Sequence, residues 1–210
     1  MSRESSLTLD RGLALLQAVA DAGGAAATVS ELAAAIGTSR AAVYRLLVPL
    51  SERGLVWRDG SRVRLGAGIL RLADQMRPQL RQAARPVLRA LADDVRATAH
   101  LSIAEGEHLH VIAVAEPAGT ALHVAYRIGS RHPASRGAAG KALALRARGK
   151  GWATATGEPQ PGVHGIAAPL RGVLGLRAAV GVVSLEPPDA TTVGPRVVDA
   201  AGALADVVRD

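Results

Sequence analysis

Residues 28–65 read TVSELAAAIGTSRAAVYRLLVPLSERGLVWRDGSRVRL, and this stretch decides the fold of the first part of the chain. It begins with a short amphipathic segment, for which Ser30 is the expected N-cap. Gly37 ends that helix because glycine enters the left-handed region at little cost, and Thr38 or Ser39 caps a second helix. Two short helices joined by a glycine-containing turn predict a helix-turn-helix.

The second helix of this pattern separates apolar residues from polar and small ones. Val43, Leu46 and Leu47 fall on one side at helical spacing. Small and hydrogen-bonding side chains allow a helix to enter the major groove of duplex DNA, and the predicted contacts are Ser39, Arg40, Ala42, Tyr44 and Arg45. Pro49 removes one helical hydrogen bond, so we expect a kink near residues 45–47.

A basic hairpin follows the two helices. Asp59-Gly60 is a strong turn signal, and the residues after it alternate with period two. A helix-turn-helix followed by such a hairpin indicates a winged helix-turn-helix, whose wing arginines Arg58, Arg62 and Arg64 we expect to contact phosphate or the minor groove. The alternative, ordinary surface helices and a solvated hairpin, does not explain why these features follow one another in this order.

Composition excludes several classes of protein. The 210 residues carry a formal charge of +7, and residues 40–66 alone hold six arginines against two acids. The absence of cysteine excludes disulfides, thiolate metal sites and cysteine nucleophiles. An aromatic content of 2% excludes base-stacking platforms for single strands. We find no bilayer-length apolar run and no signal peptide, and therefore expect a cytoplasmic protein without membrane contact.

No residue pattern supports catalysis or a metal site. The segment GAAGKA at 137–142 fails as a phosphate loop, because Ser135 stands at the first glycine position and Ala142 replaces the magnesium-binding Ser or Thr. His108 and His110 could share a strand face, but no further ligand completes a site. We therefore predict no catalytic residues, no metal, no cofactor and no enzymatic activity.

The rest of the chain predicts an α+β protein. Apolar spacing indicates a first helix at about 8–22, a linker helix within 67–84 and another helix that starts at Pro86. Beyond residue 97 a sheet is expected from strands at 100–104, 108–115, 121–128, 163–170 and 176–185, with helices at about 137–148 and after Pro188. The expected domains are a DNA-binding domain at 1–66, a linker helix at 67–84 and a second domain at 85–210.

The chain resembles the IclR family of bacterial transcriptional regulators. DRGLALLQAVADAGG and the stretch from SELAAAIG to RVRLG resemble the winged helix-turn-helix of that family. ARPVLRALADDVRATAHLSI resembles the entry into its ligand domain. IGSRHPASRGAAGKALAL and GEPQPGVHGIAAPLRGVLGLRAAVGVVSLEPP resemble two signatures of that domain. The resemblance covers nearly the whole chain.

The resemblance implies a homodimer or tetramer that binds double-stranded operator DNA, with a GAF-like domain of antiparallel sheet and flanking helices. Such a domain accepts a small organic acid or aromatic effector between its sheet and a covering loop and helix. By position, the effector-binding residues would be Arg136, Gly137, Ala138, Ala139, Pro169, Val182 and Ser184. Gly137 would let a ligand carboxylate approach backbone amides, and Ser184 would supply a hydroxyl.

Two features of the sequence depart from the family pattern. Only residues 146–150 separate GKALAL from GWATATGE, where family members carry a few tens of residues, and Val182 stands where a polar residue is often found. The effector domain is therefore shortened, and its pocket is expected to be smaller, more open or inactive. Two alternatives stay open: a DNA-binding regulator without effector sensing, and a winged protein-interaction module.

Overall fold

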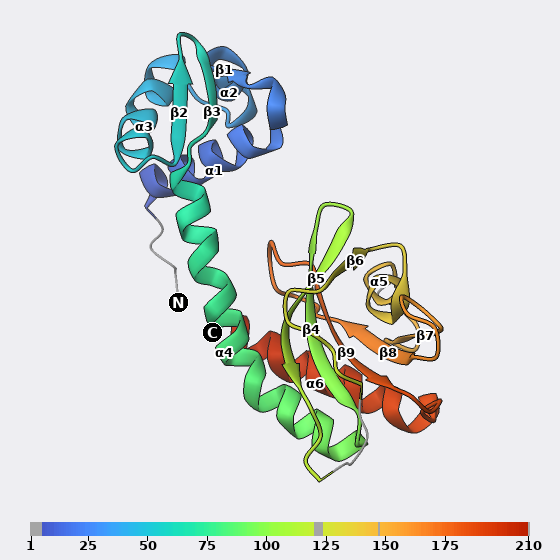
Figure 1. Ribbon diagram of the computed structural model, residues 1–210. Helices are drawn as coiled ribbons and strands as arrows, with labels where there is room; N and C mark the ends of the chain where they lie inside the picture. Colours follow the sequence, from blue (N-terminus) through green and yellow to red (C-terminus); the bar gives the residue numbers. More distant parts are fainter. Residues whose placement is uncertain (1–5, 120–123, 147, 210) are drawn as a thin grey trace. The chain divides into compact units, whose positions relative to one another are not determined.

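The computed structural model describes residues 6–119, 124–146 and 148–209, and the chain divides into two units, Met1–Met76 and Arg77–Asp210 (Figure 1). The first unit holds short helices and a small sheet, and the second holds a larger antiparallel sheet with helices on both faces. The α+β class expected from the sequence is therefore confirmed. Each unit is described by itself below.

The first unit is a three-helix winged fold. Its helices are α1 (Leu7–Asp21), α2 (Val29–Ala35) and α3 (Arg40–Glu52), and a short 3-10 turn (Gly23–Ala25) follows α1. Its strands β1 (Ala27–Thr28), β2 (Val56–Asp59) and β3 (Arg62–Leu65) form a sheet in the order β1-β3-β2. One apolar core joins the helices to the sheet, and its fully buried side chains are Leu15, Val19, Val29, Leu32, Val43, Leu47, Val56 and Val63.

Polar caps fix where the two helices of the motif begin. The cap of α2 is Thr28 and not Ser30, because Thr28 and Glu31 form a reciprocal capping box in which each side chain accepts the other residue's backbone N–H. Ser39 caps α3 and accepts from the amide of Ala42 at 3.2 Å. The helix α3 continues through Pro49 to Glu52.

Glycines bring the start of the next helix against the turn between α3 and β2. The amide of Gly66 donates to the carbonyl of Leu55 at 2.8 Å, and that of Gly68 donates to Gly54 at 2.9 Å. A Cβ at Gly68 would lie 2.8 Å from the carbonyl oxygens of Arg53 and Gly54. Only glycine fits this crossing of two backbones.

A single long helix replaces the two helices expected around the prolines. The helix α4 spans Gly68–Val95 and contains both Pro78 and Pro86. Its buried residues Leu80, Ala84, Leu88, Leu91 and Ala92 form one continuous stripe. Burial of this stripe compensates for the hydrogen bonds that the two prolines remove. The boundary between the two units falls inside α4, after Met76.

The second unit is built on six antiparallel strands. They are β4 (Thr98–Glu105), β5 (His108–Ala115), β6 (Arg131–Pro133), β7 (Ala153–Thr156), β8 (His164–Pro169) and β9 (Ala178–Ser184), in the order β6-β5-β4-β9-β8-β7. The strand expected at 121–128 is not formed by residues 124–128, and residues 121–123 lie outside the described part. The short edge strands β6 and β7 were not expected from the sequence.

Helices cover both faces of this sheet. The part of α4 from Arg77 onward and α6 (Ala190–Arg209) lie on one face, and α5 (Gly137–Leu143) lies on the other (Figure 1). The α4 and α6 side holds the larger core, with Leu101 and Val180 from the sheet and Leu204 from α6. The α5 side is built mainly from alanines, so α5 packs close to the sheet.

A tryptophan packs at the end of the connection between α5 and β7. Trp152 precedes β7 and packs against the core of the α4 and α6 side. Its indole lies on Gly194 of α6, where a Cβ would overlap the ring and come within 2.6 Å of the indole nitrogen. The neighbouring Gly151 has φ +81° and faces Val198. A Gly-Trp pair therefore holds the start of β7 against α6.

We predict that Gly194→Ala destabilises the second unit by about 1–3 kcal/mol, because the new methyl group collides with Trp152. Gly202→Ala on the same helix is the matched control, since its Cβ would meet nothing within 4 Å. It should leave stability unchanged or raise it by about 0.5–1 kcal/mol. Urea unfolding of the full chain measures both variants, and equal stability of the two would contradict the proposed packing.

Candidate DNA-binding and effector sites

The outward face of α3 presents the side chains expected to meet DNA. Val43 and Leu47 are buried, so the residues on the opposite side, Ala41, Tyr44, Arg45 and Val48, are exposed at helical spacing. Arg40 is exposed at the first turn, and the hydroxyl of Ser39 is engaged in capping. The predicted residue Ala42 is half-buried, and Ala41 takes its place on the exposed face.

Two of the three wing arginines stack on aromatic rings, and the third has a structural role. The guanidinium of Arg58 lies 5.4 Å from the ring centre of Tyr44, which joins the wing to α3. The guanidinium of Arg64 lies 5.8 Å from the ring centre of Trp57. Arg62 instead donates to the carbonyl oxygens of Ala25 and Ala26 at 3.2 and 3.1 Å. Its predicted contact with phosphate therefore competes with these bonds.

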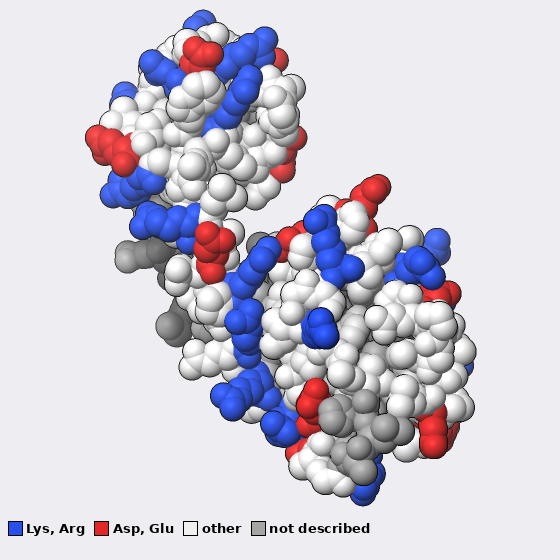
Figure 2. Space-filling view, in the orientation of Figure 1, with Lys and Arg blue, Asp and Glu red and all other residues white. Residues whose placement is uncertain are grey.

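The exposed end of the first unit is basic. Figure 2 shows arginine side chains around β2 and β3 with few acidic groups among them. Within the described residues, no acidic group lies within 4 Å of the guanidinium of Arg40, Arg45, Arg58 or Arg64. Four unneutralised guanidiniums on α3 and the wing suit a polyanion.

A row of buried polar side chains lies on the α5 side of β4. Thr98, His100 and Ser102 alternate with apolar residues that face α4 and α6. The Nδ1 atom of His100 lies 3.1 Å from the hydroxyl of Ser102, and its ring meets Tyr126 edge to face. Burial, together with the nearby His132, lowers the pKa of His100 to about 3. The imidazole is therefore neutral at neutral pH.

Beside this row lies an open crevice of about 290 Å³ that could hold a small acid. Its polar lining consists of Tyr126, Ser130, Arg131, His132, Arg136 and Gln160. Two guanidiniums can pair with a carboxylate, and Tyr126 offers an aromatic face and a hydroxyl. Burial raises the pKa of Tyr126, so this hydroxyl stays protonated.

The structure brings only part of the predicted effector-binding set together. Arg136 lines the crevice, whereas Ala138 and Ala139 are buried between α5 and the sheet. Pro169, at the end of β8, is half-buried and lies outside the crevice lining. Val182 belongs to the core that faces α4 and α6, across the sheet from α5. Ser184 lies on the same face of β9 as Val182, and its hydroxyl donates to the carbonyl of Glu186 at 2.7 Å.

The backbone amide that was expected to receive a ligand carboxylate has another partner. The N–H of Gly137 donates to the carboxylate of Glu158 at 3.1 Å. The same carboxylate accepts from Lys141 at 3.3 Å. Both hydrogen bonds lower the pKa of Glu158, and the bond from Gly137 has the larger effect. A carboxylate of the chain itself therefore occupies the position that the sequence assigned to the effector.

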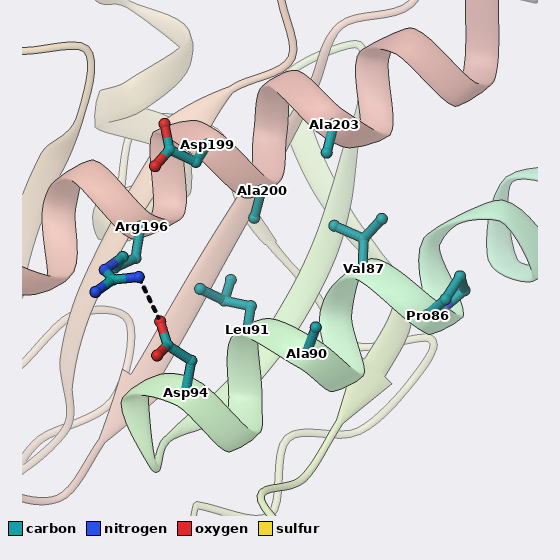
Figure 3. Close-up of a pocket in the computed structure, with 9 residues that line it drawn as sticks. All are labelled: Pro86, Val87, Ala90, Leu91, Asp94, Arg196, Asp199, Ala200 and Ala203. Atoms are coloured by element: carbon teal, nitrogen blue, oxygen red, sulfur yellow. Dashed lines mark ion pairs between the residues drawn. The ribbon is translucent and has the colours of Figure 1, made fainter.

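A larger hollow on the other side of the domain has the wrong chemistry for an acid. It measures about 560 Å³ and lies between α4 and α6, where Val87 and Leu91 face Ala200 and Ala203 (Figure 3). Its charged groups are Asp94, Asp199 and Arg196, and the guanidinium of Arg196 is already paired with Asp94 at 3.5 Å. An organic acid there would face two carboxylates, so the crevice beside Tyr126 is the better candidate.

Sequence reasoning missed several residues of both sites. Ala41 and Val48 follow from the helix phase once α3 is known to begin at Arg40. The crevice residues come from the polar run YRIGSRHP at 126–133, directly before α5. Their density of hydrogen-bonding groups was the available signal.

Comparison with known proteins decides the family. Residues 8–60 match the IclR helix-turn-helix domain, and residues 75–146 match the C-terminal domain of the bacterial transcriptional regulator IclR. The chain belongs to the IclR family of transcriptional regulators. The members of this family are regulators and not enzymes. The second match ends at residue 146, within the connection between α5 and β7.

The relatives support the same assignment. The HTH-type transcriptional regulator BhcR of Paracoccus denitrificans (strain Pd 1222) is 31% identical over 149 residues, which are 67% of this chain and 50% of BhcR. The chain thus aligns with about half the length of this relative. The crystal structure of an IclR-type regulator from Silicibacter sp. TM1040 is 26% identical, with a TM-score of 0.54 and 97% and 96% of the two chains covered.

A third relative was solved with a bound ligand. It is an IclR homolog from Microbacterium hydrocarbonoxydans complexed with 4-hydroxybenzoate, 19% identical, with a TM-score of 0.53 and 96% and 99% of the two chains covered. At this identity the similarity concerns the fold.

Two remaining expectations concern metals and membranes. Within the described residues, no three His, Asp or Glu side chains gather as a metal site, and the Nε2 atom of His110 lies 3.4 Å from Glu105. Nor does any described helix combine the length and apolarity that a membrane span requires.

Proposed function

We propose that this IclR-family regulator binds operator DNA through α3 and the wing, as a homodimer or tetramer, and that a small organic acid or aromatic acid modulates the binding. The observation that carries the proposal is the exposed face of α3, where Arg40, Tyr44 and Arg45 stand free of acidic partners within the described residues. An exposed helix face of this kind suits the major groove, in which arginine pairs with guanine.

Apolar residues on the first unit support self-association. Leu9 and Leu13, one turn apart on α1, are 61% and 56% exposed. Leu72 and Met76, one turn apart on α4, are also exposed and belong to the same unit. Clustered exposed leucines cost solvation free energy unless another surface covers them. A second copy of the chain is the partner proposed to cover these residues, because an operator with two-fold symmetry is bound by a dimer.

The crevice beside Tyr126 is the proposed effector site. Arg131 and Arg136 supply two positive charges, and Tyr126 supplies an aromatic surface. This combination matches an aromatic acid such as 4-hydroxybenzoate, the ligand in the structure of the Microbacterium homolog. The alternative function, a regulator that binds DNA without an effector, is favoured by the shortened connection at 146–150.

Alanine at both Arg40 and Arg45 should weaken binding to DNA from upstream of the protein's own gene by at least about tenfold, since each base contact contributes about 1–3 kcal/mol. The slope of log affinity against log salt should fall by up to about two. Fluorescence anisotropy measures both quantities. The matched control is the Arg85→Ala/Arg127→Ala protein, which loses the same charge from the second unit. Equal affinity of the two variants would count against α3 as the reading helix.

Sedimentation velocity should show the wild-type chain as a dimer or larger at micromolar concentration. Leu9→Glu/Leu13→Glu should shift it to monomer, because four charges would be buried in the dimer contact. Leu174→Glu is the control, since Leu174 is fully exposed in the second unit. A wild-type chain that sediments as a monomer would overturn the proposed assembly.

In thermal unfolding, 4-hydroxybenzoate or another acid of an organic-acid panel should stabilise the wild-type chain, by about 2.7 kcal/mol at a hundredfold excess over Kd. The Arg131→Ala/Arg136→Ala variant should lose this stabilisation, and Arg127→Ala should keep it. If no acid in the panel shifts the wild-type melting temperature, the alternative of a regulator without an effector is supported.

A further inference from the structure

An exposed tryptophan on the wing is not explained by the fold. Trp57 lies on β2, which is an edge strand of the sheet β1-β3-β2, and its side chain is 53% exposed. Its neighbours Val56 and Arg58 point to the opposite face, where Val56 is buried in the core and Arg58 reaches Tyr44. Trp57 therefore faces away from the core. Exposing so large an apolar surface is costly without a partner.

The side chain opposite Trp57 is an arginine. Trp57 pairs with Arg64 across β2 and β3, and the guanidinium lies 5.8 Å from the ring centre. Both residues are exposed, and no described acidic group lies within 4 Å of this guanidinium. An arginine held against an aromatic ring loses less freedom when it binds an anion, because its planar fork is already oriented.

The surroundings of Trp57 indicate the chemistry of the partner. The apolar wing residues Val56, Val63 and Leu65 lie on the other face of the sheet. Trp57 shares its own face with Arg64, Arg62 and Asp59, so it is not part of an apolar patch. A protein partner bound by apolar contact would need more apolar neighbours. Positive charge beside an aromatic ring suits the sugar-phosphate backbone of DNA.

The wing is also held next to the reading helix. The stacking of Arg58 on Tyr44 ties β2 to the exposed face of α3. A duplex whose major groove receives α3 therefore brings a strand of its backbone towards the edge strand β2, which carries Arg58 on one face and Trp57 on the other.

We propose that Trp57 and Arg64 together form a DNA-backbone contact on the outer face of the wing, in which Trp57 holds the guanidinium of Arg64 over a phosphate. This inference rests on the proposed function and adds a positioning residue, Trp57, to the predicted DNA-binding set. The contact is independent of base sequence, because phosphates carry no base identity.

Tryptophan fluorescence tests the contact directly, because the chain contains only Trp57 and the half-buried Trp152. Titration with DNA from upstream of the protein's own gene should quench the emission of the wild-type chain. Trp57→Phe retains Trp152 and should show no quenching at saturating DNA. Trp57 is exposed and outside the core, so this variant should fold as the wild type does.

The affinity of two alanine variants for DNA distinguishes the role of Trp57 from that of Arg64. Trp57→Ala should weaken binding about two- to tenfold without changing its salt dependence. Arg64→Ala should weaken it and lower the salt slope by about one. Unchanged fluorescence together with unchanged affinity of Trp57→Ala would overturn the inference. This result differs from failure of the proposed function, in which the wild-type chain binds no DNA or the Arg40/Arg45 variant binds as well as the wild type.

Discussion

The DNA-binding unit depends on the burial of one face of α3. Val43 and Leu47 are inserted into the core formed by α1, α2 and the sheet. Because an α-helix turns 100° per residue, this burial forces Tyr44 and Arg45 outward. The caps at Thr28 and Ser39 fix where each helix starts, and so they fix the phase of the exposed side chains. A shift of one residue would place Tyr44 in the buried position that Val43 now fills.

The second unit follows a different constraint, in which small residues set the distances between layers. Alanines and glycines let α5 lie close to the sheet. This close packing places the crevice with Tyr126 and Arg136 beside α5 and not beneath it. On the other face, Gly194 accepts the ring of Trp152 and holds the start of β7 against α6. The open, polar crevice is the place that this packing offers to the proposed effector.

Much of this architecture could be predicted from the sequence, and the errors have physical reasons. The winged fold, the strands at 98–115 and 164–184 and the last helix follow from periodicity and turn residues. The break expected at Pro86 did not occur, because a continuous apolar stripe outweighs two lost hydrogen bonds. The N-cap was placed at Ser30, although Thr28 and Glu31 carry the spacing of a capping box.

The lining of the candidate effector site was harder to predict than the exposed face of α3. Side chains of a strand alternate between the two faces of the sheet, so an alignment that is displaced by one residue names a side chain on the wrong face. Val182 and Ser184, for example, lie on the face of β9 that points away from α5. Ala179, Gly181 and Val183 are the residues of β9 that face α5. The crevice also draws on Gln160 and Tyr126, which are distant in the sequence and lie in irregular segments. No local pattern brings such residues together.

Hydrogen exchange of the full chain, with and without DNA from upstream of its own gene, tests the central claim most directly. The account predicts slower exchange on DNA binding in the peptides that contain residues 38–48 and 56–65. Peptides from α1, whose exposed face is assigned to the partner copy, should not change when DNA is added to the preformed dimer. DNA binding that leaves α3 and the wing unprotected, or that protects the second unit instead, would contradict the account.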